Sequence, residues 1–479
     1  MLFSSMTFIY VFLPVVCSIY LLVRNELKNH VLLLASLVFY AWGEPKYLAI
    51  MIATILINYV FAIFIEKADK ENQKETVLTL FINKKLLLAL CITANLSILC
   101  YFKYFNFFAE NINLLFKTNV DFIKVIMPIG ISFYTFQSIS YVMDVYRGES
   151  AQKDMYKLAL YIALFPQLIA GPIVKYHEIS AQIESRSVNF STLSYGIKRF
   201  IIGLSKKMLI ANTFGEIADK VFASNPDSFS PQIAWLGAIC YTVQIYFDFS
   251  GYSDMALGLG AIFGFKFPEN FNYPYISKTI TEFWRRWHIS LSSWFREYLY
   301  IPLGGNRKGN RRTYLNLFLV FLATGVWHGA AWNFVIWGIY NGFFVIIERL
   351  FKLNKDTQTR PLYQIGLLHI YCILAFIIGW VLFRSPDLEY AISYISNMFF
   401  CLDYTEEPYI LEYYISALDA LLLVFALIVC LPVFKNTLYR SENSTFLSVA
   451  VNICTYILLI ISTAQIAGST YNPFIYFRF

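Results

Sequence analysis

Charged residues are scarce in this 479-residue chain. Only 14% of its residues are Asp, Glu, Lys or Arg, whereas 58% are hydrophobic. About a quarter of the residues in an ordinary soluble domain are charged, so the composition excludes that class. The net charge of +7 does not indicate nucleic-acid binding, because loop lysines and arginines orient membrane proteins and contact anionic lipid. The composition predicts an all-α polytopic membrane protein.

Metal and cofactor motifs are also missing. The eight cysteines include no CxxC pair, and their spacing does not resemble a zinc site. The chain has no Walker motif, no GxGxxG ahead of a helix, no HExxH and no GxSxG. We therefore expect no bound metal and no bound cofactor. The sequence does not support an ATPase, a nicotinamide-dependent enzyme or a zinc protease.

The chain lacks long hydrophilic domains and internal repeats, and apolar runs fill most of it. No basic segment or cleavage site accompanies the first run, so we expect a retained span rather than a signal peptide. Eleven or twelve spans are predicted over one domain, residues 1–479, depending on whether His30–Trp42 crosses fully. The runs are Met6–Val23, His30–Trp42, Lys46–Ile65, Leu86–Phe105, Ile123–Tyr146, Leu158–Ile173, Ile233–Phe263, Tyr314–Trp327, Trp332–Ile347, Ile365–Phe383, Ala417–Val433 and Phe446–Ala467.

Basic loop clusters predict one topology. The clusters lie at residues 67–85, 307–312, 349–360 and 435–440. Placing them in the cytoplasm satisfies the positive-inside tendency and puts the acidic segment 387–407 and both termini outside. In the amphipathic stretch Leu193–Phe222, four basic residues fit this topology less well: Lys198, Arg199, Lys206 and Lys207. We interpret it as lying in the membrane interface.

One histidine, His328, interrupts the apolar run Thr313–Arg349. An ionisable residue at membrane depth is costly and usually retained for function. A helix starting near Tyr314 would reach His328 after about 21 Å, well inside a hydrocarbon core of about 30 Å. Small residues around the imidazole leave room for another molecule or let helices pack closely. The positions expected to share its helical face are Thr324, Gly325, Ala331 and Trp332.

A second histidine lies in an aromatic segment that is too polar to span. Apolar residues from Ile280 to Tyr298 follow helical spacing, and His288 lies at the edge of this stripe. We expect the helix to lie at the cytoplasmic interface or to re-enter the protein. His288 is either a polar boundary residue or a second functional group. Candidates for holding donor phosphates, or equally lipid headgroups, are Arg285, Arg286 and Arg296.

Two further apolar stretches contain groups that need partners. Asp248 and Asp254 lie within a predicted span, and the sequence AGPI at 170–173 breaks another. Carboxylates and broken helices are tolerated at membrane depth where they line a cavity or the protein interior. Hydrogen bonding between helices is the alternative.

Taken together, these motifs resemble the membrane-bound O-acyltransferase family. The resemblance lies in the run from NYPY through WRRWHISLSSWFREYLYIPLGGN to TGVWHGAAWNFVIWG. AGPI, QIYFDFSGYSDMALG and the C-terminal NPFIYFRF are similar to its bacterial branch. Within that branch the chain is similar to members that O-acetylate alginate, peptidoglycan or cellulose. The segment Asp387–Tyr414 favours these members over the D-alanyl transfer proteins of the teichoic acid pathway.

The resemblance implies a ring of helices around a funnel or tunnel, faced by His328 and His288 as catalytic residues. Trp327, Trp332, Asp248 and Asp254 are candidates for lining it. The implied reaction carries an acetyl group from a cytosolic thioester, acetyl-CoA, across the cell membrane to a surface polysaccharide or peptidoglycan. A separate extracytoplasmic esterase-like (SGNH-type) partner often completes the transfer. A neutral imidazole suits the removal of a proton from the acceptor hydroxyl.

Two other functions remain open. A transporter or flippase of an acylated carrier would use broken helices and coupling-ion carboxylates, for which Asp248 and Asp254 are the candidates. A scaffold that only recruits a partner gives no reason for an imidazole in hydrocarbon. The C-terminal tail after Pro473 is either an interfacial aromatic anchor or folds back toward the tunnel. In the second case Tyr476 would accept the acyl group as a relay.

Overall fold

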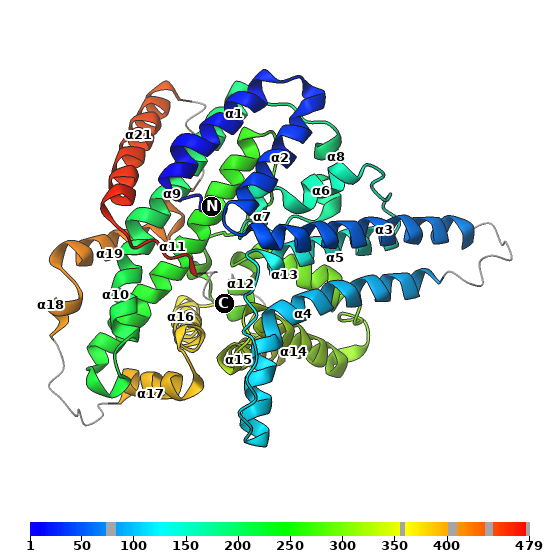
Figure 1. The fold of residues 1–479 in the computed structure, drawn as a ribbon. Helices are drawn as coiled ribbons and strands as arrows, with labels where there is room; N and C mark the ends of the chain where they lie inside the picture. Colours follow the sequence, from blue (N-terminus) through cyan, green and yellow to red (C-terminus); the bar gives the residue numbers. More distant parts are fainter. Residues whose placement is uncertain (73–82, 355–359, 401–409, 436–443, 476–479) are drawn as a thin grey trace. The chain divides into compact units, whose positions relative to one another are not determined.

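The computed structural model describes residues 1–72, 83–354, 360–400, 410–435 and 444–475. Over these residues every regular element is a helix (Figure 1), which confirms the predicted all-α class. The chain divides into two compact units, Met1–Phe200 with Met255–Pro268, and Ile201–Asp254 with Glu269–Phe479. Two of the three boundaries fall inside helices, α9 (Phe190–Ser205) and α11 (Pro231–Ile262), and the third follows Pro268. A single domain over residues 1–479 stays a prediction.

The first unit consists of the helices before residue 200 and the end of α11. Its elements before α9 are η1 (Phe8–Phe12), α1 (Leu13–Leu22), η2 (Asn25–Leu27), α2 (Lys28–Ala41), η3 (Pro45–Tyr47), α3 (Leu48–Asn72), α4 (Lys84–Phe116), α5 (Ile131–Tyr146), α6 (Met155–Ala163), α7 (Phe165–Leu168) and α8 (Tyr176–Glu184). Helix α3 packs against α4 and α5. The buried amides of Asn58 and Asn95 exchange hydrogen bonds of 2.9 and 3.0 Å across the α3–α4 contact, so these polar groups are satisfied within the apolar interface.

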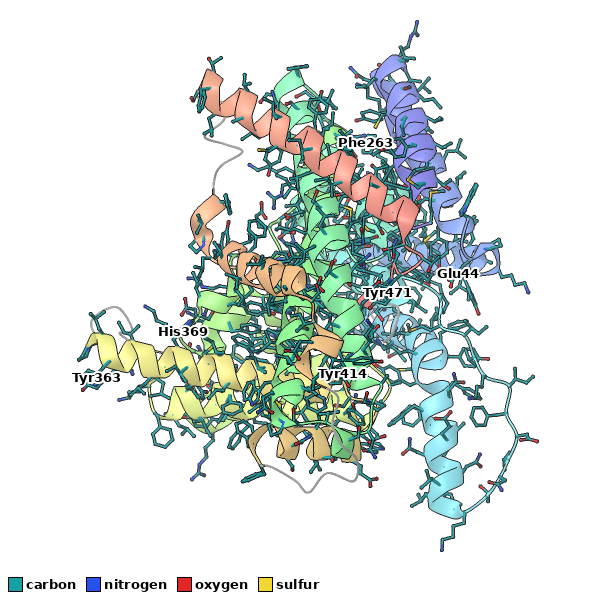
Figure 2. All side chains as sticks on the ribbon, turned by 90° about the vertical axis from the view of Figure 1, so that its left-hand side faces the viewer. Glu44, Phe263, Tyr363, His369, Tyr414 and Tyr471 are labelled. Atoms are coloured by element: carbon teal, nitrogen blue, oxygen red, sulfur yellow. The ribbon has the colours of Figure 1, made fainter. Side chains whose placement is uncertain are left out.

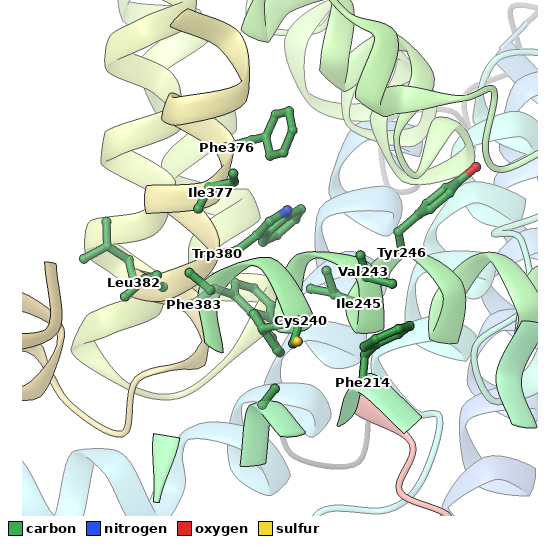
Figure 3. Close-up of a cluster of buried hydrophobic side chains, with 14 of the residues drawn as sticks. Phe214, Cys240, Val243, Ile245, Tyr246, Phe376, Ile377, Trp380, Leu382 and Phe383 are labelled. Carbon is green, nitrogen blue, oxygen red and sulfur yellow. The ribbon is translucent and has the colours of Figure 1, made fainter. Parts of the chain in front are cut away.

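The second unit contains both predicted histidines. Its elements besides α11 are η5 (Lys206–Ala211), α10 (Asn212–Phe222), η6 (Pro226–Ser228), η7 (Pro274–Ile276), α12 (Ile280–Arg286), α13 (Ile289–Phe295), η8 (Arg296–Tyr300), α14 (Gly309–His328), α15 (Trp332–Leu350), α16 (Leu362–Arg384), α17 (Leu388–Phe399), α18 (Leu411–Tyr414), α19 (Ala417–Val429), η9 (Pro432–Phe434) and α21 (Thr445–Gly468). Figure 3 shows part of its apolar core, in which Trp380 of α16 lies near Ile245 of α11.

Within the described residues, four helices are long and apolar enough to cross a membrane. They cover Pro45–Asp69, Lys84–Phe116, Leu362–Arg384 and Thr445–Gly468, and shorter apolar helices cover Phe8–Leu22 and Ala417–Val429. At the start of α16, Tyr363 (Figure 2) is exposed, as expected of an aromatic side chain at an interface. The polytopic class is therefore confirmed, and the total of eleven or twelve spans stays a prediction.

Two predicted spans have the wrong limits. Ile123–Tyr146 becomes helical only at Ile131, because Pro128 and the left-handed Gly130 (φ 76°) precede α5. Leu158–Ile173 is not one helix: α6 ends at Ala163 and α7 at Leu168. A Cβ on Gly171 would lie 2.6 Å from Gln167 Cα, so the AGPI break brings two backbone segments together, as glycine allows.

The predicted amphipathic stretch Leu193–Phe222 is helical along its length. Helices α9, η5 and α10 follow one another without a break. Lys207 is almost fully buried, whereas Lys206 is partly exposed. The interfacial position of this stretch stays a prediction.

Candidate active site

His328 is the last residue of α14. The helix begins at Gly309, five residues before the predicted start, and the backbone becomes extended at Gly329. At 1.5 Å per residue, His328 lies about 24 Å along the helix from Arg312. The prediction that Ala331 and Trp332 share its helical face is wrong, because the chain leaves the helix before reaching them.

The glycines near His328 serve helix packing. A Cβ on Gly325 would lie 2.4 Å from Phe334 O and 2.9 Å from Gly338 Cα. A Cβ on Gly329 would lie 2.2 Å from the Phe334 ring. Both spaces are therefore filled by α15, and the interpretation that these glycines leave room for another molecule is wrong. They let α14 and α15 approach closely, as small residues do between membrane helices.

Three aromatic rings surround the His328 imidazole. Their centroids lie 4.9 Å away for Trp327, 5.0 Å for Trp337 and 5.2 Å for Phe383. The last two meet the imidazole nearly edge to face, at 87° and 81°, a favourable arrangement for aromatic pairs. These contacts fix the orientation of the ring in a low-dielectric setting, which strengthens electrostatic interactions made there.

A small cavity lies against this imidazole. Its volume is about 20 Å³, room for roughly one water molecule. Its lining residues are Ile245, Phe249, Trp287, His328, Trp337, Trp380, Phe383 and Ile475. His328 is the one ionisable side chain among them. A reacting atom in this cavity would therefore meet a single proton-accepting group with apolar walls around it.

His288 does not lie in a continuous helix, so the predicted single stripe from Ile280 to Tyr298 is wrong. Helix α12 ends at Arg286, and α13 begins at Ile289. Between them His288 adopts the left-handed region, with φ 44°, which is uncommon for any residue other than glycine. The break aims the buried His288 ring at Phe249, 4.6 Å away, and toward Trp327, 6.2 Å away. Phe249 also lines the His328 cavity.

Asn270 fixes the tautomer of His288. The backbone N–H of Ser290 donates to Asn270 Oδ1 over 3.2 Å, as does the Ser290 hydroxyl over 2.9 Å. Because a backbone N–H only donates, the Oδ1 atom is identified as the acceptor. His288 Nδ1, 3.1 Å from the same oxygen, must then carry a proton. In the neutral ring, Nε2 consequently holds the lone pair.

A distant carboxylate holds the start of α12. Glu348, fully buried at the end of α15, accepts the backbone N–H groups of Ile280 at 2.5 Å and Thr281 at 2.8 Å. The hydroxyls of Thr281 and Tyr371 also donate to it. These bonds satisfy N–H groups that a helix start leaves unpaired and tie α12, with the His288 turn behind it, to α15 and α16.

The remaining predicted residues lie in different settings. Arg286 pairs with Glu282 at 2.9 Å, whereas Arg285 and Arg296 are exposed. Trp327 is buried against both histidines. Trp332 is 58% exposed and is not part of the cavity wall. Tyr476 lies outside the described residues.

Asp248 and Asp254 each form an ion pair with a neighbouring lysine. Asp248 lies 2.8 Å from Lys207, and Asp254 lies 2.6 Å from Lys206. Neither aspartate is part of the wall of the His328 cavity. Asn270 and Lys207 were not among the predicted site residues, although Asn270 opens the motif-rich segment and Lys207 lies in an otherwise apolar stretch.

Known proteins resemble this chain over its whole length. The family described as MBOAT, membrane-bound O-acyltransferase, matches residues 77–384. A probable alginate O-acetylase of Pseudomonas putida is 39% identical over 503 residues, covering 100% of both chains. The peptidoglycan O-acetyltransferase of Helicobacter pylori is 37% identical over 433 residues, which cover 83% of this chain and 80% of that protein.

The match to the predicted alternative branch is shorter. The teichoic acid D-alanyltransferase of Bacillus subtilis is 34% identical over 254 residues, covering 50% of this chain and 63% of that protein. The family match spans both histidines, the glycine contact between α14 and α15, and the Glu348 cap on α12. The chain belongs to the membrane-bound O-acyltransferase family.

Proposed function

We propose that this protein is an O-acetyltransferase of the cell membrane that acts on a surface polysaccharide. The observation that carries the proposal is the placement of His328 as the one ionisable group in an apolar cavity. The full-length similarity to a probable alginate O-acetylase and the similarity to a peptidoglycan O-acetyltransferase support acetyl as the group transferred. They also support a polysaccharide or peptidoglycan as the acceptor.

In the proposed reaction, His328 acts as general base. Its neutral imidazole takes the proton of the attacking hydroxyl while the oxygen forms a bond to the thioester carbonyl. The carbon–sulfur bond then breaks, and the proton passes to the leaving thiolate. Apolar walls around the imidazole keep competing water away from the thioester. In this proposal His288 Nε2, which holds a lone pair in the tautomer set by Asn270, acts as a hydrogen-bond acceptor in the reaction.

The donor in this proposal is a cytosolic acyl thioester, acetyl-CoA. It would enter from the side of the basic segment 307–312, where exposed arginines such as Arg285 and Arg296 suit bidentate phosphate binding. The acetyl group would cross the membrane within the protein, and an extracytoplasmic esterase-like partner of the SGNH type would complete its delivery. The lipid bilayer surrounds the apolar helices.

Two alternatives receive less support. D-alanyl transfer is favoured by relatives that match only 50% of this chain. A transporter or flippase of an acylated carrier needs carboxylates that bind a coupling ion. Both candidates, Asp248 and Asp254, lie in ion pairs with lysines, and an ammonium already neutralises each charge.

A transfer assay on purified protein separates enzyme from transporter. Detergent-solubilised protein is incubated with radiolabelled acetyl-CoA, and release of free CoA and transfer of the label to an acceptor are followed. We expect activity in the parent and its loss in His328→Ala at equal amounts of protein. His30→Ala is the matched control, because His30 is exposed and its ring stacks on Tyr156, outside the cavity wall. Full activity in His328→Ala contradicts the general-base role.

A further inference from the structure

The chain after α21 returns to the interior of the second unit. The Tyr471 hydroxyl (Figure 2) donates to Asp219 of α10 over 2.7 Å. The Asn212 side-chain amide donates to Tyr471 O over 3.1 Å. Phe474 stacks on Tyr252 of α11 with centroids 4.6 Å apart, and it is 4% exposed. Residues 471–475, called the tail segment below, are therefore packed against α10 and α11.

A buried ion pair holds the backbone of this tail segment. Lys207 of η5 lies 2.8 Å from Asp248 of α11, and their side chains are 3% and 1% exposed. The Lys207 ammonium also donates to the Pro473 carbonyl and to Asn212 Oδ1. Asp248 Oδ2 accepts the Ile475 N–H over 2.9 Å. Each member of the pair thus binds a different backbone group of the tail segment.

These contacts reach the active cavity. Ile475, whose N–H is bound by Asp248, lines the cavity with His328. Two charges with so little exposure are expensive to desolvate unless hydrogen bonds satisfy them. The tail backbone supplies such bonds to both. The tail segment therefore helps to offset the desolvation cost of the ion pair. In turn, the ion pair holds Ile475 in position.

We propose that Lys207 and Asp248 are positioning residues that clamp the tail segment into the wall of the His328 cavity, and that acyl transfer requires this clamp. The inference rests on the proposed function, because it takes this cavity as the place of transfer. The residue that follows the clamp in the sequence is Tyr476. The clamp acts on the backbone, so it serves the reaction without touching the reacting atoms.

The chain contains a matched control for a purely structural pair. Lys206 and Asp254, 2.6 Å apart, also join η5 to α11. Lys206 is adjacent to Lys207 in the sequence and is more exposed, at 23%. If the only task of Lys207 were to join these two helices, replacing Lys206 and Lys207 would have similar effects on the tail. The clamp predicts that only the Lys207 change releases it.

Maleimide labelling of an Ile475→Cys protein measures the position of the tail directly. The purified protein in detergent is labelled over time, and mass spectrometry quantifies the peptide that contains residue 475. Native Cys454, which is exposed, serves as internal standard. We expect labelling at 475 to be slow in the parent and with Lys206→Met, and at least tenfold faster with Lys207→Met. Equal rates in all three overturn the clamp.

A single change leaves one buried charge unpaired and threatens folding. The double variant Lys207→Met/Asp248→Leu removes both charges, and we expect it to accumulate with fast labelling at 475. A shortened variant that ends after Tyr471 keeps Lys207, Asp248 and α21 but lacks the backbone groups that this ion pair binds. We expect it to accumulate without transferring acetyl. Normal transfer by this shortened protein overturns the proposal whatever the double variant does.

His328→Ala separates the clamp from the proposed function. In this variant we expect slow labelling at 475 together with loss of transfer. Slow labelling with full transfer would contradict the role of His328 and leave the clamp standing. If the Lys207→Met protein combined fast labelling at 475 with undiminished transfer, Lys207 would hold the tail but the reaction would not need the tail to be held. That result would overturn the proposal.

Discussion

The two histidines are held by different forces. His328 ends a helix and is fixed by the rings of Trp327, Trp337 and Phe383. His288 lies in the left-handed region, a conformation that costs most L-residues roughly 1–2 kcal/mol. Its hydrogen bond to Asn270 and the capped helix before it offset that cost. Substitutions at His288 therefore test backbone shape and ring chemistry at once.

Asparagine tolerates the left-handed region better than alanine does. We expect His288→Asn to retain the native thermal unfolding temperature in detergent and a measurable part of the transfer rate, because its amide can still form hydrogen bonds. We expect His288→Ala to be less stable by about 1 kcal/mol and to lose transfer. Equal loss of transfer in both variants, at equal protein, would instead indicate that His288 moves a proton.

The hydroxyl of Tyr476 is the predicted acyl acceptor in the C-terminal tail. In the relay hypothesis the Tyr476 oxygen attacks the thioester carbonyl, His328 takes its proton, and the thiol leaves. The acetyl ester then passes to an external hydroxyl and Tyr476 regains its proton. We expect Tyr476→Phe to stop polymer acetylation at normal accumulation, with acetyl found on the C-terminal peptide of the parent by mass spectrometry. Normal acetylation in this variant would contradict the relay and indicate that the tail is only an interfacial anchor.

At the scale of elements, the crossing of α14 and α15 is the tightest constraint on the site. Gly325 and Gly338 meet there with no space for a Cβ. Because both helices carry walls of the cavity, Trp337 on α15 and His328 on α14, a change in their separation moves the imidazole relative to its aromatic neighbours.

Replacing Gly325 by alanine places a methyl group 2.4 Å from Phe334 O. We expect this variant to lose transfer and to unfold at a lower temperature. Overpacking should lower its free energy of unfolding by about 1–3 kcal/mol. Gly366→Ala in α16 is the control, because nothing lies within 4 Å of its Cβ, and helix propensity predicts a gain of up to about 1 kcal/mol. Similar unfolding temperatures for the two variants would contradict the close crossing.

The helical class could be predicted from the sequence because hydropathy is a local signal. His328 could be named as a candidate because it interrupts an apolar run, and its catalytic role stays a prediction. The break at His288 could not be predicted, because neither Gly nor Pro lies at 287–289. The turn depends instead on Asn270, 18 residues earlier. The packing role of the glycines at 325 and 329 could be recognised only once the position of Phe334 was known. The partner of Asp248 in the tail is 227 residues away, beyond any local pattern.

At the scale of the whole molecule, loop charge sets the direction in which the acetyl group would travel. The basic segment 307–312 is predicted to face the cytoplasm, and the acidic segment 387–407, part of which lies outside the described residues, is predicted to face outward. This orientation gives the proposed donor and acceptor opposite sides of the membrane.

Site-resolved cysteine labelling in right-side-out vesicles tests this topology. With an impermeant maleimide we expect Lys308→Cys to react only after the vesicles are opened, and Glu389→Cys to react at once. Both positions are exposed in the structure, so access to the reagent is limited by the membrane alone. Immediate reaction at 308 would reverse the assignment of sides.

The wall position of Ile475 has a consequence for biosynthesis. The cavity that holds His328 is completed by Ile475, which follows His328 by 147 residues in the sequence. During translation both histidines, the Glu348 cap and the glycine crossing are made long before this wall exists. A nascent or prematurely terminated protein would insert its helices and still lack a closed site.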